Sequence, residues 1–202
     1  MAMTERDKKV YDFLVMSRLP FTIEQIGCMF YNSNGNIRSA YTVASRRISV
    51  MCRGGYLEKQ SGSKFGSETI VYAVKPSKQL RHQLTLSKFI YMLMSNGFRV
   101  TYVDIEHSFK DYGIRCDGLI EISYNKKSYT VITEVNLNTE FNPKYDTLTK
   151  DLTEGKIKLK RPVIFVNISD HKFNPETFTY CKPVCLKTDL SNFSKFQYLF
   201  VK

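Results

Sequence analysis

The feature that most constrains the fold of this chain is a pair of apolar stretches on either side of a polar turn, between residues 114 and 140. One apolar run follows Asp117, another precedes Glu134, and the segment 123–128 between them is rich in turn-forming residues. This pattern predicts two strands joined as a β-hairpin. Asp117 and Glu134 are then equally far from the turn, so their carboxylates should face the same way across neighbouring strands.

Two carboxylates in that arrangement are ligands that a hard cation such as Mg²⁺ or Mn²⁺ prefers. A cation held in this way can activate water and stabilise the charge that develops during phosphodiester cleavage. Asp117 and Glu134 are therefore candidate metal ligands and candidate catalytic residues.

The charge balance points to a polyanionic partner. The 202 residues include 30 Lys and Arg against 19 Asp and Glu, a net charge of +11. Of these, 12 basic and 6 acidic residues lie up to Lys78, and 18 and 13 follow it, so both halves are basic. Nucleic acid is the polyanion that such a balance favours. The alternative is that the basic charge serves solubility alone, as in many small proteins.

The cysteines favour reduced thiols over disulfides or a zinc site. Their number, five, is odd and no Cys-x-x-Cys pair occurs; they are Cys28, Cys52, Cys116, Cys181 and Cys185. We find neither a secretory signal pattern nor an apolar run of membrane-spanning length. The sequence therefore predicts a cytoplasmic protein with no membrane partner, no small-molecule substrate and no resident cofactor, unless the acidic pair holds Mg²⁺ or Mn²⁺.

Residues 1–77 are predicted to form a winged helix-turn-helix domain. A helix capped by Thr4 should run to about residue 16, and a capping box of Thr22 and Gln25 should open a second helix over 23–31. After a turn at 32–36 a third helix is expected over 37–51, ending before Gly54. Two strands, 56–60 and 69–74, then flank a Gly- and Ser-rich tip.

The third helix carries the predicted DNA-reading residues. Its apolar face is expected to comprise Ile37, Tyr41, Ala44, Ile48 and Met51. The opposite face and its shoulders carry polar residues that could reach base edges in the major groove, namely Arg38, Ser39, Thr42, Ser45 and Arg46. Lys59 on the first wing strand and Lys64 at the wing tip could bind phosphates. Alternatively, these side chains keep an exposed helix soluble, or the domain binds protein.

Residues 78–202 are predicted to form an α/β domain with a central mixed sheet, so that the whole chain is α+β. The expected order is a helix over 80–96, a strand over 98–105, the acidic hairpin, a helix within 144–159 and a buried strand over 162–168. Short further strands are expected at 184–186 and 196–201.

This α-β-β-β-α-β order, with Asp117 and Glu134 on adjacent strands, resembles the PD-(D/E)XK nuclease-like superfamily. A winged helix followed by His82-Gln-Leu84, Asp117-Gly-Leu119 and Glu134-Val-Asn-Leu-Asn-Thr-Glu140 resembles, more narrowly, the replication-relaxation proteins of plasmids and phages. The resemblance implies a double-stranded DNA-binding protein of a mobile element, acting in replication, transfer or transcriptional control. A homodimer would suit a palindromic target.

The chain departs from the nuclease pattern at two positions. Asn136 stands where the pattern asks for lysine, and Cys116 precedes Asp117 where the pattern has proline. Asn136 supplies no positive charge to orient water or to offset the charge on a phosphate, so we expect the nuclease-like domain to be inactive. If Lys144 or Lys150 supplied that charge, with Glu140 as a further ligand, the protein would be a Mg²⁺- or Mn²⁺-dependent endonuclease directed by the winged helix. A third alternative makes both halves protein-interaction modules.

Overall fold

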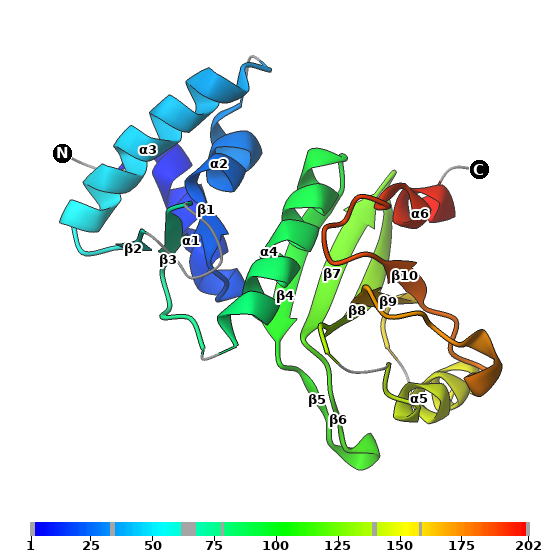
Figure 1. Ribbon diagram of the computed structural model, residues 1–202. Coiled ribbons are helices and arrows are strands. Elements are labelled where there is room, and N and C mark those ends of the chain that lie inside the picture. The colour runs from blue at the N-terminus through cyan, green and yellow to red at the C-terminus, as the bar shows by residue number, and fades with distance from the viewer. Residues whose placement is uncertain are drawn as a thin grey trace. The chain divides into compact units, whose positions relative to one another are not determined.

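The computed structural model describes residues 3–32, 35–61, 68–77, 79–138, 141–157 and 159–200. It is an α+β structure that divides into two compact units, Met1–Asn96 and Gly97–Lys202 (Figure 1). Within the described ranges, no helix combines the length and the apolar character needed to cross a membrane.

In its described residues the first unit has four helices, a π-helical turn and a small antiparallel sheet in the strand order β1-β3-β2. In chain order its elements are α1 (Glu5–Ser17), β1 (Phe21–Thr22), α2 (Ile23–Ile26), the π-turn η1 (Gly27–Tyr31), α3 (Ile37–Arg53), β2 (Glu58–Gln60), β3 (Ile70–Tyr72) and α4 (Leu80–Ser95).

Both predicted capping boxes are confirmed. The Thr4 hydroxyl accepts from the Asp7 amide at 3.2 Å, and the Asp7 carboxylate accepts from the Thr4 amide at 2.7 Å. Thr22 and Gln25 exchange the equivalent bonds at 3.1 and 2.9 Å. Each pair satisfies amides that the first helical turn leaves without partners, which is why the starts of α1 and α2 could be predicted from the sequence.

The prediction of the buried face of α3 was partly wrong. Ala44, Ile48 and Met51 are buried as expected, but Tyr41 is 46% exposed and Ile37 is 53% exposed. Ala40 takes the inward position instead, because α3 passes very close to the π-turn at Gly27: a Cβ there would lie 3.1 Å from the Ala40 carbonyl group. The small residue therefore faces inward, and the bulky Tyr41 beside it faces solvent.

A buried ion pair links α1 to α3. Asp7 is fully buried and accepts hydrogen bonds from Arg47 Nε at 3.1 Å and from the Tyr31 hydroxyl at 2.9 Å. Burial alone would raise the pKa of Asp7, but hydrogen bonds from Arg47, Thr4 and Tyr31 outweigh it and hold the pKa well below its ordinary value of 3.8.

Helix α4 groups with the first unit, whereas the sequence analysis placed the domain boundary before it, after residue 77. One tie to this unit is the Ser87 hydroxyl, which is fully buried and donates to the Pro20 carbonyl at 2.5 Å. Hydroxyl bonds of this kind, between residues far apart in the sequence, leave no periodic signal in the chain.

The second unit is built on a mixed five-stranded sheet in the order β10-β9-β8-β7-β4. The strands are β4 (Arg99–Ile105), β7 (Gly118–Tyr124), β8 (Lys127–Asn136), β9 (Val163–Ser169) and β10 (Val184–Leu186). The first three pair antiparallel, and β9 and β10 add in parallel. Helix α5 (Lys144–Thr153) connects β8 to β9, and an apolar cluster that includes Leu119, Ile132, Tyr145 and Leu148 fills the space between α5 and the sheet.

The acidic hairpin forms with a tighter turn than expected. Tyr124 pairs with Lys127, and only Asn125 and Lys126 lie between them, at φ angles of 48° and 64°. Two consecutive residues with positive φ are typical of the hairpin turn whose twist matches that of the strands.

The second unit contains one arm that the sequence did not predict and one element that it predicted wrongly. The polar stretch before the hairpin forms a two-stranded arm, β5 (Ser108–Phe109) with β6 (Ile114–Arg115), joined by η2 (Lys110–Tyr112) (Figure 1). The strand expected at 196–201 is helical, as α6 (Ser194–Gln197) and η4 (Tyr198–Phe200). Phe196 packs against Phe193 and Phe200 at centroid distances of 5.7 and 5.3 Å, a helical spacing of three and four residues.

Replacing Asp7 by Ala should destabilise the first unit by about 3 kcal/mol, because it leaves the largely buried Arg47 and the Tyr31 hydroxyl without their acceptor. Since the pKa of Asp7 is lowered, this stabilisation is present above pH 3.8 and is lost as the pH falls below it. Urea unfolding followed by circular dichroism measures the difference. The exposed Asp12→Ala on the same helix is the control and should change little. Equal effects of the two substitutions would contradict this role for Asp7.

Candidate nucleic-acid interface and candidate metal site

An open groove of about 700 Å³ runs along the exposed face of α3, with Lys59 of β2 also in its lining. Its lining residues are Tyr41, Thr42, Ser45, Arg46, Ser49, Cys52, Arg53 and Lys59. Thr42, Ser45, Ser49 and Arg53 recur at three- and four-residue intervals, so they lie along one face of the helix. We call this feature the α3 groove.

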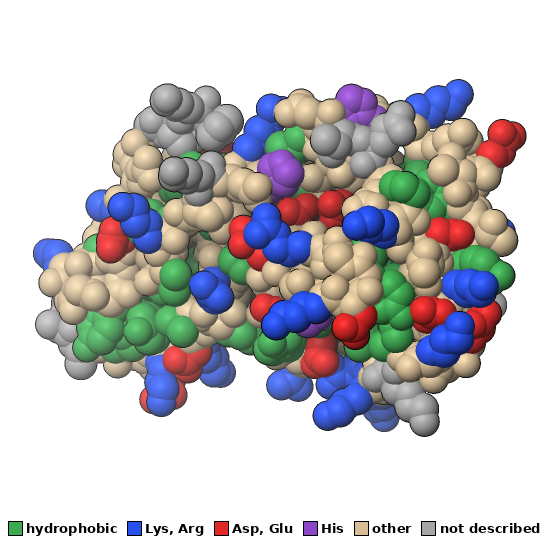
Figure 2. All heavy atoms as spheres, turned by 90° about the horizontal axis from the view of Figure 1, so that it is seen from below, with side chains coloured by type: hydrophobic (Ala, Val, Ile, Leu, Met, Phe, Trp, Pro, Cys, Tyr) green, Lys and Arg blue, Asp and Glu red, His purple; other side chains and the backbone are tan. Residues whose placement is uncertain are grey.

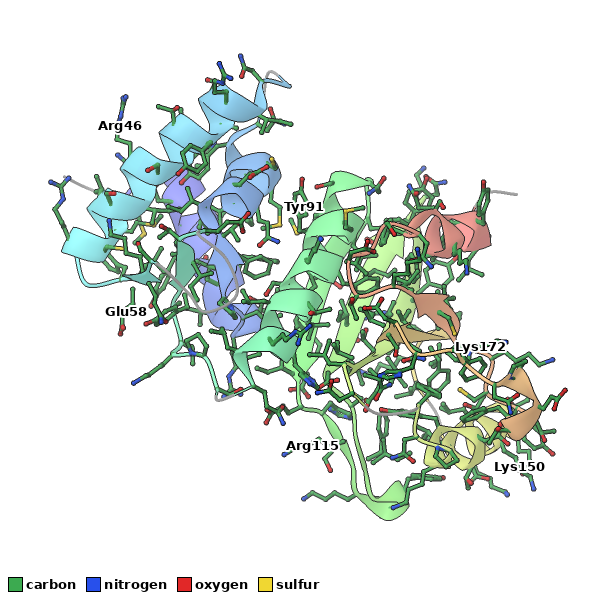
Figure 3. All side chains as sticks on the ribbon, in the orientation of Figure 1. Arg46, Glu58, Tyr91, Arg115, Lys150 and Lys172 are labelled. Carbon is green, nitrogen blue, oxygen red and sulfur yellow. The ribbon has the colours of Figure 1, made fainter. Side chains whose placement is uncertain are left out.

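The charge of the α3 groove is wholly positive. Arg46, Arg53 and Lys59 line it, and among the described residues neither its lining nor α3 itself contains an acidic one. Arg46 extends from α3 away from the body of the unit (Figure 3). On another face of the molecule, Lys and Arg side chains are interspersed with acidic ones (Figure 2). The net charge alone therefore does not locate an interface, whereas the α3 groove concentrates cations without acidic neighbours in its lining.

The hydroxyl groups of the α3 groove are partly used within the helix. Thr42 Oγ1 donates to the Arg38 carbonyl at 3.0 Å, and Ser49 Oγ donates to the Ser45 carbonyl at 2.9 Å. Their oxygens keep lone pairs that can accept. The α3 groove therefore presents cationic donors from Arg and Lys together with hydroxyl acceptors.

Four of the predicted DNA-binding residues come together in the α3 groove: Thr42, Ser45, Arg46 and Lys59. Arg38 and Ser39 are exposed in the first turn of α3 and do not line it. The Ser39 amide donates to Asn36 Oδ1 at 3.0 Å, which caps the helix. Lys64 lies outside the described residues.

The groove also has four lining residues that were not predicted from the sequence: Tyr41, Ser49, Cys52 and Arg53. Arg53 and Ser49 continue the spacing of Thr42 and Ser45, so the period could have identified them. Tyr41 was expected in the core because its spacing from Ala44 and Ile48 fits one helix face. Burial raises the pKa of the Cys52 thiol, and the Lys59 ammonium nearby opposes this shift.

In the second unit, the strand register agrees with the predicted pairing of the two carboxylates. Gly118 pairs with Thr133 in an antiparallel register. Asp117, just before Gly118, therefore lies opposite Glu134, just after Thr133. Asp117 Oδ2 accepts from the Val135 amide at 2.7 Å, and Glu134 Oε2 accepts from the Tyr145 hydroxyl at 2.7 Å. The pair thus lies at the end of the sheet face that α5 covers.

The environment of Glu134 disfavours its charged form. Burial, together with the nearby charge of Asp117, raises the pKa of Glu134 to about 7, although hydrogen bonds from Tyr145 and from the Asp117 amide oppose the shift. Burial also raises the pKa of the neighbouring Cys116 thiol well above its usual range. A cation between Asp117 and Glu134 would relieve this repulsion, so the two carboxylates fit Mg²⁺ or Mn²⁺ as partial ligands.

Asn136 lies on the same face of β8 as Glu134 and is buried. Its Nδ2 donates to Asn167 Oδ1 of β9 at 2.9 Å. The position at which the nuclease pattern asks for an ammonium group therefore holds an amide bonded to a neighbouring strand.

Lys144 and Lys150, the two lysines that could have supplied the missing ammonium group, each lie beside other residues. Lys144 Nζ would lie 3.2 Å from a Cβ placed at Gly113, and Lys150 Nζ lies 5.7 Å from the centre of the Tyr180 ring. Glu140 is outside the described residues.

No protein-family model, curated protein or solved structure matches the chain. Within the part of the chain that the structure describes, no cluster of three or more His, Cys, Asp or Glu side chains has metal-binding geometry. His82 of the His82-Gln-Leu84 motif is half-buried on α4. Another histidine, His107, is hydrogen-bonded through Nδ1 to Asp104 Oδ2 at 2.7 Å.

Replacing Glu134 by Gln should stabilise the protein at pH 8 and change little at pH 4. The pKa rises from 4.5 in the unfolded chain to about 7 in the folded protein, so the folded state loses stability as the pH rises between these values, by about 3 kcal/mol in total. Urea unfolding of both proteins at the two pH values measures this difference. The exposed Glu176→Gln serves as control, and a Glu134→Gln effect that is independent of pH would contradict the assignment.

Proposed function

We propose that this protein binds double-stranded DNA through the α3 groove, with the first unit acting as a winged helix-turn-helix. The observation that carries the proposal is the joining of Arg46, Arg53 and Lys59 in one groove without an acidic lining residue. The element order α1-β1-α2-α3-β2-β3, with its strands in one antiparallel sheet, supports the domain assignment.

In this proposal α3 enters the major groove and β2 follows the sugar–phosphate backbone. Arg46 has the reach and planar donor geometry for the paired acceptors of a guanine edge. Lys59 and Arg53 lie at the β2 and C-terminal sides and bind phosphates, which positions the helix without reading sequence. Thr42 and Ser45 supply short polar side chains for adjacent bases.

For the second unit we propose a PD-(D/E)XK nuclease-like fold that no longer cleaves DNA. The order β4-β7-β8-α5-β9, which α4 of the first unit precedes in the chain, and the opposed carboxylates of Asp117 and Glu134 support the fold. Asn136, bonded to Asn167, supports the loss of activity. By the resemblance to replication-relaxation proteins, the chain would serve replication, transfer or transcriptional control of a mobile element, and a homodimer would suit a palindromic site.

A second candidate is a Mg²⁺- or Mn²⁺-dependent endonuclease. The observation that favours it is the raised pKa of Glu134 beside Asp117, since like charges held together are typical of metal sites and of acid–base pairs. A metal held there would supply a polarised phosphate and an activated water. Asp117 and Glu134 would hold the metal, and Asn136 could offer only a hydrogen bond.

We expect Arg46→Ala to weaken binding to duplex DNA about tenfold, through loss of a charged donor at the base edges. Lys59→Ala should weaken binding to all sequences alike and lower the slope of log affinity against log salt by about one. Fluorescence anisotropy with random and selected duplexes at several salt concentrations measures both effects. The matched control is Lys9→Ala, an exposed lysine on α1 that does not line the α3 groove. Affinity that neither groove substitution nor added salt changes would refute DNA binding at this surface.

Plasmid DNA should stay intact when the protein is incubated with Mg²⁺ or Mn²⁺, because residue 136 brings no ammonium group to the acidic pair. Agarose electrophoresis of supercoiled plasmid provides the measurement. Nicking that depends on the metal and disappears in both Asp117→Asn and Glu134→Gln would favour the endonuclease instead. Nicking that survives both substitutions has another source and does not bear on this site.

A further inference from the structure

A second groove, of about 540 Å³, lies entirely within the second unit. The C-terminal half of α5 and the turn after it form one wall, and the segment entering β10 forms another. The first residues of β9 lie between them. We call it the α5 groove; it shares no residue with the α3 groove or with the acidic pair.

The lining of the α5 groove is mainly aliphatic. Seven of its 14 lining residues are Leu, Ile or Val, among them Leu152, Val184 and the half-exposed Leu199. Thr149 and Thr153 donate their hydroxyl protons back to α5 carbonyls at 2.7 and 2.8 Å. These threonines therefore contribute methyl groups more readily than donors to the lining.

The charge of the α5 groove is positive. Arg161 and Lys182 line it, and the part of the lining that the structure describes includes no acidic residue. Arg161 is paired with Glu121, which fixes its position beside the aliphatic lining. Lys150 lies at the rim, where its ammonium is 5.7 Å from the centre of the Tyr180 ring and 4.0 Å from Glu154 Oε1.

The walls of the α5 groove are held by hydrogen bonds inside the unit. Asp146 Oδ1 of α5 accepts from the Tyr180 and Cys181 amides at 2.6 and 2.7 Å, which ties the segment before β10 to the helix. The Thr130 amide donates to the Pro162 carbonyl at 2.9 Å, which fixes the entrance of β9. A groove held in this way needs little reorganisation to accept a ligand.

We propose that the α5 groove docks a peptide segment of a partner protein in which an apolar side chain is flanked by carboxylates. The aliphatic lining would take the apolar side chain, and Lys182 would face the flanking acids; Arg161 and Lys150, which Glu121 and Glu154 already pair, would add a weaker attraction. A nucleic-acid strand fits less well, because stacking of bases needs exposed aromatic faces and Tyr180 is the one exposed ring of the described lining. The proposal does not depend on DNA binding by α3.

The test is a selection of displayed random peptides of about 12 residues on the full-length protein, followed by anisotropy with the enriched peptides. Enriched sequences should share a Leu, Ile or Phe flanked by Asp or Glu. Lys182→Glu and Leu199→Asp should each weaken their binding about tenfold or more, and Lys182→Arg should retain it. Lys182 and Leu199 are exposed, so circular dichroism should show that the variants fold.

Lys187→Glu is the matched control, because Lys187 is an exposed lysine of the same unit outside the groove; its binding should stay within about twofold of the unsubstituted protein. Absence of an enriched acidic–apolar class would overturn the proposal. So would enriched peptides that bind Lys182→Glu and Leu199→Asp normally. A single-stranded oligonucleotide that binds in place of peptides, and that Lys182→Glu releases, would assign the groove to nucleic acid and also overturn it.

Discussion

The ion pair between Asp7 and Arg47 fixes the rotation of α3, and the function proposed for the first unit depends on that rotation. Of the four arginines on α3, Arg47 is turned inward to a fully buried carboxylate. Successive residues of a helix are rotated by about 100°. Arg46 is therefore directed outward, together with Thr42 and Arg53. A helix rotated by one residue would bury Arg46 and take the cations out of the groove, and a charge left unpaired in the interior makes that state costly.

The charged groups of the two candidate sites differ in sign and in exposure. In the α3 groove, cations remain on an exposed face without acidic neighbours in the lining, which is favourable for a polyanionic ligand and costs little in the unbound protein. At the end of β8, two carboxylates are held close together in a partly buried place, which disfavours ionisation of Glu134. The neutral pair of Asn136 and Asn167 beside them satisfies its hydrogen bond without adding charge. No positive charge is therefore added beside the two carboxylates by this pair, which is the feature on which the proposed loss of cleavage rests.

Local signals were predictable from the sequence, and features that depend on tertiary packing were not. Capping by Thr4 and Thr22 and the register of the acidic hairpin follow from residues a few positions apart or related by one turn. The exposure of Tyr41 depends on the close passage of α3 over Gly27, which periodicity does not reveal. The inward turn of Arg47 depends on a carboxylate 40 residues away. The strand predicted at 196–201 is helical instead: its aromatic residues suit either a strand or a helix, and the packing of Phe196 on Phe193 and Phe200 favours the helix.

The most direct test of DNA binding through α3 is a backbone amide chemical-shift titration of the full chain with a duplex of about 20 base pairs. We expect the largest changes for residues 41–53 and for Lys59, with smaller changes over the sheet of the second unit. Changes confined to residues 97–200, or none at a concentration at which the duplex is bound, would contradict it.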